Sequence, residues 1–118
     1  MLTFTAQQMK AMAAPSRHAF EQRTMQHLRR AFPERLAGVP DERIVAFIQF
    51  GIERAKRYGI VGRIDVRRYL VYMLTYGTRF DTDPAIGWAG EILRNRTLGP
   101  SRRMDMIDAH HMFRRERG

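Results

Sequence analysis

The sequence contains no cysteine, which excludes disulfides, thiolate catalysis and thiolate zinc sites. It has only two serines, Ser16 and Ser101, and both stand where helix caps belong rather than in a glycine-flanked nucleophile elbow. No segment approaches the roughly 20 apolar residues that span a bilayer, and the opening MLTFTAQQMKAMAA lacks the apolar core of a signal peptide. We therefore expect a cytoplasmic protein with no membrane partner.

Lysine is also scarce. The chain has two lysines, nineteen arginines and twelve acids, for a net charge of +9. This balance makes nucleic acid an obvious partner to test, because neutralised phosphates supply most non-specific affinity. The basic residues are scattered as pairs with acids between them, and no RNA-binding signature appears. These pairs are Arg29 and Arg30, Arg67 and Arg68, Arg102 and Arg103, and Arg114 and Arg115.

The 118 residues are 44% hydrophobic, which suits one globular domain spanning 1–118. No run alternates as a strand does, so we expect an all-α fold: a compact single-domain bundle of about five helices with short connections. Helices are expected over about 6–14, capped by Thr5 and kinked or restarted at Pro15, and then over 17–31, 41–58, 65–76, 84–93 and 101–114. The tail from about 114 is expected to fray.

The helix that begins after Pro40 shows a clear apolar face. Asp41 and Glu42 suit its first turn, and the apolar positions repeat at helical spacing from Ile44 to Ala55. Its opposite side is expected to be solvated; it carries Arg43, Glu53, Arg54, Lys56 and Arg57.

The next helix has apolar residues on more than one side. Its main stripe is Val66, Tyr69, Leu70, Met73 and Leu74, and Val71, Tyr72 and Tyr76 extend apolar character round the far side. Such a helix is either central to a bundle or carries an exposed apolar strip. We favour a central helix.

The stretch YGTRFDTDPAIGWAGEIL, residues 76–93, could be a metal loop, a catalytic turn or the corner between two helices. A calcium loop from Asp81 would need glycine and glutamate where Ile86 and Ile92 stand, so that interpretation fails. As a corner between helices it works: Gly77 ends one helix, Asp83 caps the next, and Pro84 takes its first position. Phe80 should fill the elbow, while Trp88, Ile92 and Leu93 face the core.

Residues with catalytic potential do not converge in the sequence. The four histidines lack the i, i+4 spacing of a helical zinc site; they are His18, His27, His110 and His111. Helix caps and solvated surfaces account for the carboxylate pairs Asp81 with Asp83 and Asp105 with Asp108. We therefore expect no catalytic residue, no metal and no cofactor, and a protein that is not an enzyme.

Three segments carry a resemblance to a known family: FPERLAGVPDERIVAFIQFGIERAKRYGI, DVRRYLVYMLTYGTRFDTDP and WAGEIL. Together, over roughly Phe20 to Leu93, the chain resembles small helical accessory proteins encoded beside the spike, tip and effector genes of bacterial type VI secretion systems. The resemblance implies a bacterial accessory that helps to load, fold or attach a secreted effector or spike component, and that is exported with it or stays in the cytoplasm. The chain departs from the pattern around Arg67 and Tyr72, where relatives are often less basic.

Two hypotheses follow. The preferred one is a non-enzymatic adaptor or chaperone-like protein that binds a protein partner through aromatic and apolar side chains rimmed by arginine, the usual anchors of interfaces. The candidate residues are Arg68, Val71, Tyr72, Tyr76, Arg79 and Phe80. The alternative is a basic helical nucleic-acid-binding protein. An immunity protein for a toxin fits the same gene setting but usually needs an acidic surface. The sequence leaves the oligomeric state open.

Overall fold

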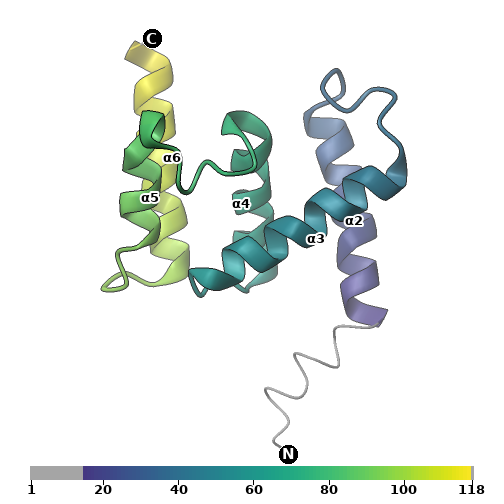
Figure 1. Ribbon diagram of the computed structural model, residues 1–118, viewed down its shortest axis with the longest axis horizontal. Coiled ribbons are helices and arrows are strands. Elements are labelled where there is room, and N and C mark those ends of the chain that lie inside the picture. Colours follow the sequence, from purple (N-terminus) through teal and green to yellow (C-terminus); the bar gives the residue numbers. More distant parts are fainter. Residues whose placement is uncertain (1–14, 118) are drawn as a thin grey trace, which may run out of the picture. The chain divides into compact units, whose positions relative to one another are not determined.

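The computed structural model describes residues 15–117, and all its regular elements are helical (Figure 1). In chain order they are α2 (Pro15–Ala31), α3 (Asp41–Arg57), α4 (Arg63–Tyr76), the 3-10 helix η1 (Pro84–Ile86), α5 (Gly87–Leu93) and α6 (Pro100–Arg117). The described part of the chain contains no strand, so the predicted all-α class is confirmed. The helix expected from about Ala6, with its Thr5 cap, lies outside the described residues.

The chain divides into two units, Met1–Gln49 and Phe50–Gly118, with the boundary inside α3. The prediction of one domain over 1–118 stays a prediction. In the first unit, α2 buries Phe20, Thr24 and Leu28, whereas Ala31, which shares their helical spacing and was expected on the same face, is exposed at the end of the helix. The connection after α2 is fixed by Arg29, whose guanidinium donates to Leu36 O at 3.2 Å and to Val39 O at 2.8 Å.

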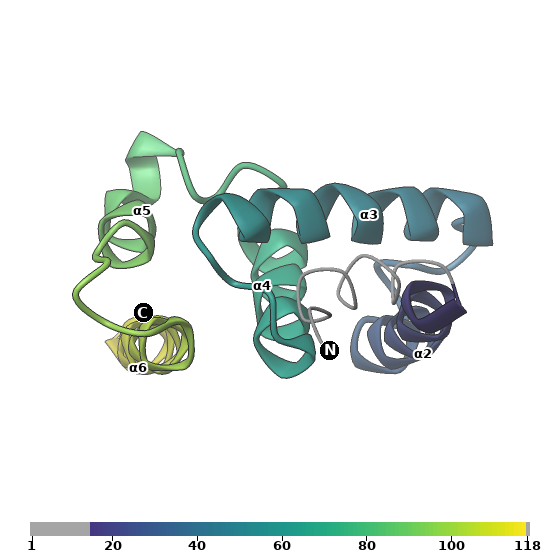
Figure 2. The ribbon, with the colours of Figure 1, turned by 90° about the horizontal axis from the view of Figure 1, so that it is seen from below.

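The second unit is built around α4, which begins two residues before the expected start at Asp65. All five residues of its predicted main stripe are buried, and Tyr72 on the far side is buried too, which agrees with a central helix. The end of α3 approaches α4 closely at Gly51, where an added Cβ would lie 2.2 Å from Leu70 Cδ2. On the other side, α6 packs against α4 and α5 (Figure 2).

The corner between α4 and α5 forms as the sequence predicted. Gly77 ends α4 with a φ of 118°, and its amide donates to Met73 O. The Asp83 carboxylate accepts from the Ala85 amide at 2.9 Å, and Pro84 opens η1, a short 3-10 turn that precedes α5. Phe80 is buried in the elbow with its ring 5.0 Å from that of Tyr69. The predicted corner is therefore confirmed, with one extra turn of helix.

The last helix runs further than expected, because α6 continues to Arg117 instead of ending near 114. The expected fraying from about 114 stays a prediction. Met104 and Ile107 are buried on its inner side, and Leu93 of α5 is buried with them, whereas Trp88 and Ile92 are half-buried.

Candidate functional site

The six predicted partner-binding residues lie at different depths of the second unit. Phe80 is 1% exposed and Tyr72 is 6% exposed, so the core holds both rings. The remaining four are half-buried Arg68, Val71 and Tyr76 and exposed Arg79. The exposed surface in this region is therefore smaller and more polar than the sequence suggested. A partner-binding role for these residues stays a prediction.

Arg68 is surrounded by carboxylates of the same unit. Its guanidinium donates to Asp65 Oδ1 at 3.1 Å, Asp105 Oδ1 at 2.7 Å and Asp108 Oδ2 at 2.6 Å. Burial lowers the pKa of Arg68, but the hydrogen bonds to Asp108 and Asp105 outweigh it and the net direction is upward. The Tyr72 hydroxyl donates to the same Asp108. This network fixes α6 against α4, so Arg68 serves the fold.

A ring cluster continues from this network. The Tyr76 hydroxyl lies 2.6 Å from His111 Nδ1, and the His110 ring stacks on Trp88 with centroids 4.1 Å apart. Burial, together with the hydrogen bond to Asp108, raises the pKa of Tyr72 well above its ordinary value. Among the side chains that the structure describes, those of residues 16–113, no three histidines, aspartates or glutamates are placed to hold a metal ion together. The histidines here pack with aromatic rings.

Asp81 has a role that its sequence position did not reveal. Its carboxylate is 1% exposed and accepts from Arg54 Nη2 at 2.7 Å and 2.9 Å and from the Tyr58 hydroxyl at 2.6 Å. The prediction that Arg54 lies on a solvated face is therefore wrong, because this side chain turns inward to neutralise Asp81. The hydrogen bond to Asp81 raises the pKa of Arg54, and burial raises that of Tyr58 to about 12. Both groups keep their ordinary charge at neutral pH.

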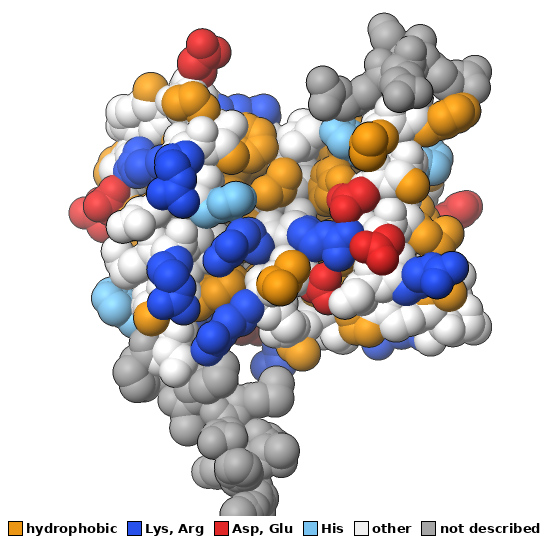
Figure 3. Space-filling model, turned by 180° about the vertical axis from the view of Figure 1, so that it is seen from behind, with side chains coloured by type: hydrophobic (Ala, Val, Ile, Leu, Met, Phe, Trp, Pro, Cys, Tyr) orange, Lys and Arg blue, Asp and Glu red, His pale blue; other side chains and the backbone are white. Residues whose placement is uncertain are grey.

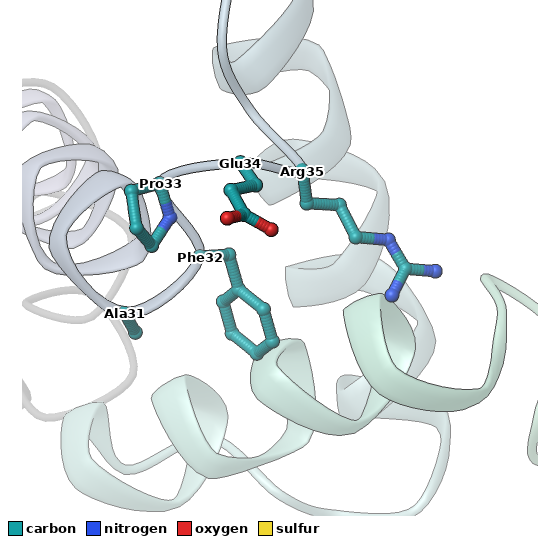
Figure 4. Close-up of a pocket in the computed structure, with 5 residues that line it drawn as sticks. All are labelled: Ala31, Phe32, Pro33, Glu34 and Arg35. Atoms are coloured by element: carbon teal, nitrogen blue, oxygen red, sulfur yellow. The ribbon is translucent and has the colours of Figure 1, made fainter.

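A hollow at the end of α2 is lined by five consecutive residues, Ala31, Phe32, Pro33, Glu34 and Arg35 (Figure 4). Its volume is about 580 Å³ and it is wide open to solvent. The close-up shows the Glu34 and Arg35 side chains pointing in different directions, so their charges do not converge on one point. This geometry does not make a catalytic centre.

The outer face of α6 exposes large apolar side chains. Met106, Met112 and Phe113 are 40%, 60% and 56% exposed, and exposed Ala109 lies among them on the same face of the helix. The sequence carried a signal for this face, because positions 106, 109 and 113 have helical spacing. That signal is easily missed, since the inner stripe of Met104 and Ile107 has the same spacing.

Figure 3 shows basic side chains interspersed with apolar ones, and several acidic side chains close to one basic side chain, with further acidic ones at the edges of the view. No helix in the described part of the chain combines the length and apolar character needed to cross a bilayer. Comparison with protein-family models, curated proteins and solved structures found no match.

Proposed function

We propose that this chain is a non-catalytic adaptor or chaperone-like protein that binds another protein through the outer face of α6. The observation that carries the proposal is the exposure of Met106, Met112 and Phe113 around Ala109. Apolar side chains exposed together mark interaction sites more often than isolated ones do. Methionine and aromatic side chains are also enriched in the centre of protein interfaces.

The polar groups of the second unit support a non-catalytic role. Asp81 is held by Arg54 and Tyr58, and Asp105 and Asp108 are held by Arg68. Groups engaged in such internal bonds stabilise the fold and are not free to react with a substrate. The proposal therefore assigns them to positioning α6.

The shape of the α6 face favours a helical segment as its partner. Ala109 is the small residue on this face, and Met106, Met112 and Phe113 are the large ones. This alternation of small and large side chains suits packing against the side-chain ridge of another helix. The chain has a net charge of +9, and the sequence after Phe113 is RRERG. A partner carrying acidic residues is favoured by this charge, whereas a second copy of the chain would be repelled. The resemblance to type VI accessory proteins makes a secreted effector or a spike component the partner we propose to test first.

The test is co-purification with the products of neighbouring genes. Met112→Ser combined with Phe113→Ser should abolish capture of the partner, because both substituted anchors are exposed residues. Ile64→Ser is the matched control, since Ile64 is 74% exposed but lies in the first turn of α4. The proposal fails if the α6 variant, shown to be folded by circular dichroism, still captures the partner as the control does.

A further inference from the structure

The methionines with described side chains fall into two groups by exposure. Met25, Met73 and Met104 are 6%, 1% and 0% exposed, whereas Met106 and Met112 are 40% and 60% exposed. The buried three belong to the cores of the two units, and the exposed pair lies on the outer face of α6. The other methionines of the sequence lie outside the described residues; they are Met1, Met9 and Met12.

Met104 and Met106 show how sharply α6 separates the two groups. They are two residues apart, which places them about 200° from each other around the helix axis. Figure 2 shows α6 end-on, with α4 and α5 on two of its sides, and both helices contact it. Met104 is buried on this inner side, and Met106 lies on the side that α4 and α5 leave open. A reagent in solution therefore reaches the Met106 side chain and not that of Met104.

Methionine is the only sulfur-containing residue in the chain, because cysteine is absent. A peroxide oxidises a thioether by transferring one oxygen atom. The sulfur lone pair attacks one peroxide oxygen, the O–O bond breaks, and the departing hydroxide takes the remaining proton to form water. Sulfur loses two electrons and the peroxide gains them. No thiol of this chain competes for the oxidant.

Oxidation changes the α6 face in a way that opposes binding. A thioether is apolar and flexible, which suits an interface, whereas a sulfoxide is polar and accepts hydrogen bonds. Burying that oxygen against an apolar partner without a donor is unfavourable. The fold should survive, because the methionines that pack its cores are shielded from the oxidant.

We propose that Met106 and Met112 are modification sites at which oxidation to methionine sulfoxide switches off the partner-binding face of α6. The inference rests on the proposed function, since it concerns the regulation of the same face. The oxidant is a peroxide, and the switch is reversible because methionine sulfoxide reductases remove the added oxygen.

The first test maps where the oxygen is added. The purified protein is treated with hydrogen peroxide for increasing times and digested with trypsin. Cleavage after Arg103 and Arg114 gives one peptide, MDMIDAHHMFR, that contains Met104, Met106 and Met112, so fragment ions must assign the oxygen to each of them. Met106 and Met112 should be oxidised at least about tenfold faster than Met104, because susceptibility follows exposure.

The second test asks whether these two sites control the face. Met106→Leu with Met112→Leu is the matched control, since leucine keeps an apolar side chain of similar size and cannot be oxidised. This variant keeps Met1, Met9 and Met12, so it reports any effect of oxidation there. Oxidised wild type should elute earlier from a phenyl column, and the oxidised control should elute unchanged; this measurement needs no partner.

Capture of the protein partner completes the test. Oxidation of the wild type should weaken capture about tenfold or more, and treatment with methionine sulfoxide reductases and a thiol reductant should restore it. The oxidised leucine control should capture the partner as the untreated protein does. Circular dichroism of the oxidised wild type should match that of the untreated protein.

Four results would overturn the switch: equal oxidation of Met104 and Met106, loss of the helical signal on oxidation, unchanged retention on the phenyl column, or loss of capture by the oxidised leucine control. Capture that survives oxidation but is abolished by Met112→Ser with Phe113→Ser would also overturn the switch, while leaving the α6 proposal intact. Capture that survives both changes would overturn both proposals.

Discussion

Removing either member of the buried Arg54–Asp81 pair should destabilise the protein far more than removing both. Asp81 is 1% exposed and Arg54 is 7% exposed, so each single substitution leaves a charge in the core without its counterion. Breaking such a pair costs about 3–5 kcal/mol, whereas replacing both charges by apolar groups is often neutral. We expect this cost for Arg54→Met and for Asp81→Leu. The double variant should lie within about 2 kcal/mol of the wild type.

Urea unfolding is the suitable measurement, because urea does not screen charges as guanidinium chloride does. Trp88, the only tryptophan, lies in the same unit as the pair, so its fluorescence reports on the relevant part of the chain. The unfolding free energies of the wild type, the two single variants and the double variant should give a coupling energy between Arg54 and Asp81 of at least about 2 kcal/mol. A wild-type stability of about 8 kcal/mol or more, within the usual range of about 5–15 kcal/mol, keeps every variant measurable.

The Arg29–Asp41 pair is the control for this cycle. Its atoms lie 2.6 Å apart, but the Asp41 side chain is 70% exposed, and we expect a coupling energy below about 1 kcal/mol. The distances in the two pairs are nearly equal, so burial is the variable being tested. A coupling energy at the buried pair no larger than at Arg29–Asp41 would refute the reasoning.

Three further outcomes can be checked on the same unfolding assay. Gly51→Ala should lose about 1–3 kcal/mol of unfolding free energy, because the new Cβ would collide with the buried side chain of Leu70. Gly87→Ala should gain up to about 1 kcal/mol, because no atom lies within 4 Å of its new Cβ. A gain at both positions would contradict the packing at Gly51. Burial raises the pKa of Tyr58 to about 12, so the folded state keeps a proton that the unfolded state releases near pH 10. Stability should therefore fall from pH 10 to 12, and Tyr58→Phe should show a shallower fall; an identical slope would sink this assignment. Arg103→Met should cost about 1–3 kcal/mol or more by leaving three carbonyls without a donor, and a neutral result would contradict the network.

Features of the fold that depend on neighbouring residues could be predicted from the sequence. Gly77, Asp83 and Pro84 act within one turn of where they stand, so the corner between α4 and α5 followed from residue type alone. The buried stripe of α4 followed from spacing for the same reason. The extra 3-10 turn was not foreseen, because Pro84 suits the first position of either kind of helix.

Features that depend on distant residues could not be predicted in this way. Arg54 and Asp81 are 27 positions apart, and the pattern around Arg54 places it on the polar side of α3. Only the fold reveals that Asp81 lies opposite and needs a cation. The same limit applies to Tyr72, whose spacing favours a central helix but also allows an exposed strip. Tyr72 is buried because α6 covers it and supplies Asp108, to which its hydroxyl donates.

A partner therefore meets fewer unpaired positive charges at the surface than the net charge of +9 indicates. Arg54 and Arg103 are buried, and Arg68 is shared among three carboxylates, so none of them offers a free cation at the surface. The arginines that stay exposed can attract an acidic partner, and that contribution should weaken steeply with salt. Association through the apolar face of α6 should weaken much less, because little of its free energy comes from charge. Salt dependence thus distinguishes association driven by charge from association through the α6 face in the wild-type protein, before any residue is changed.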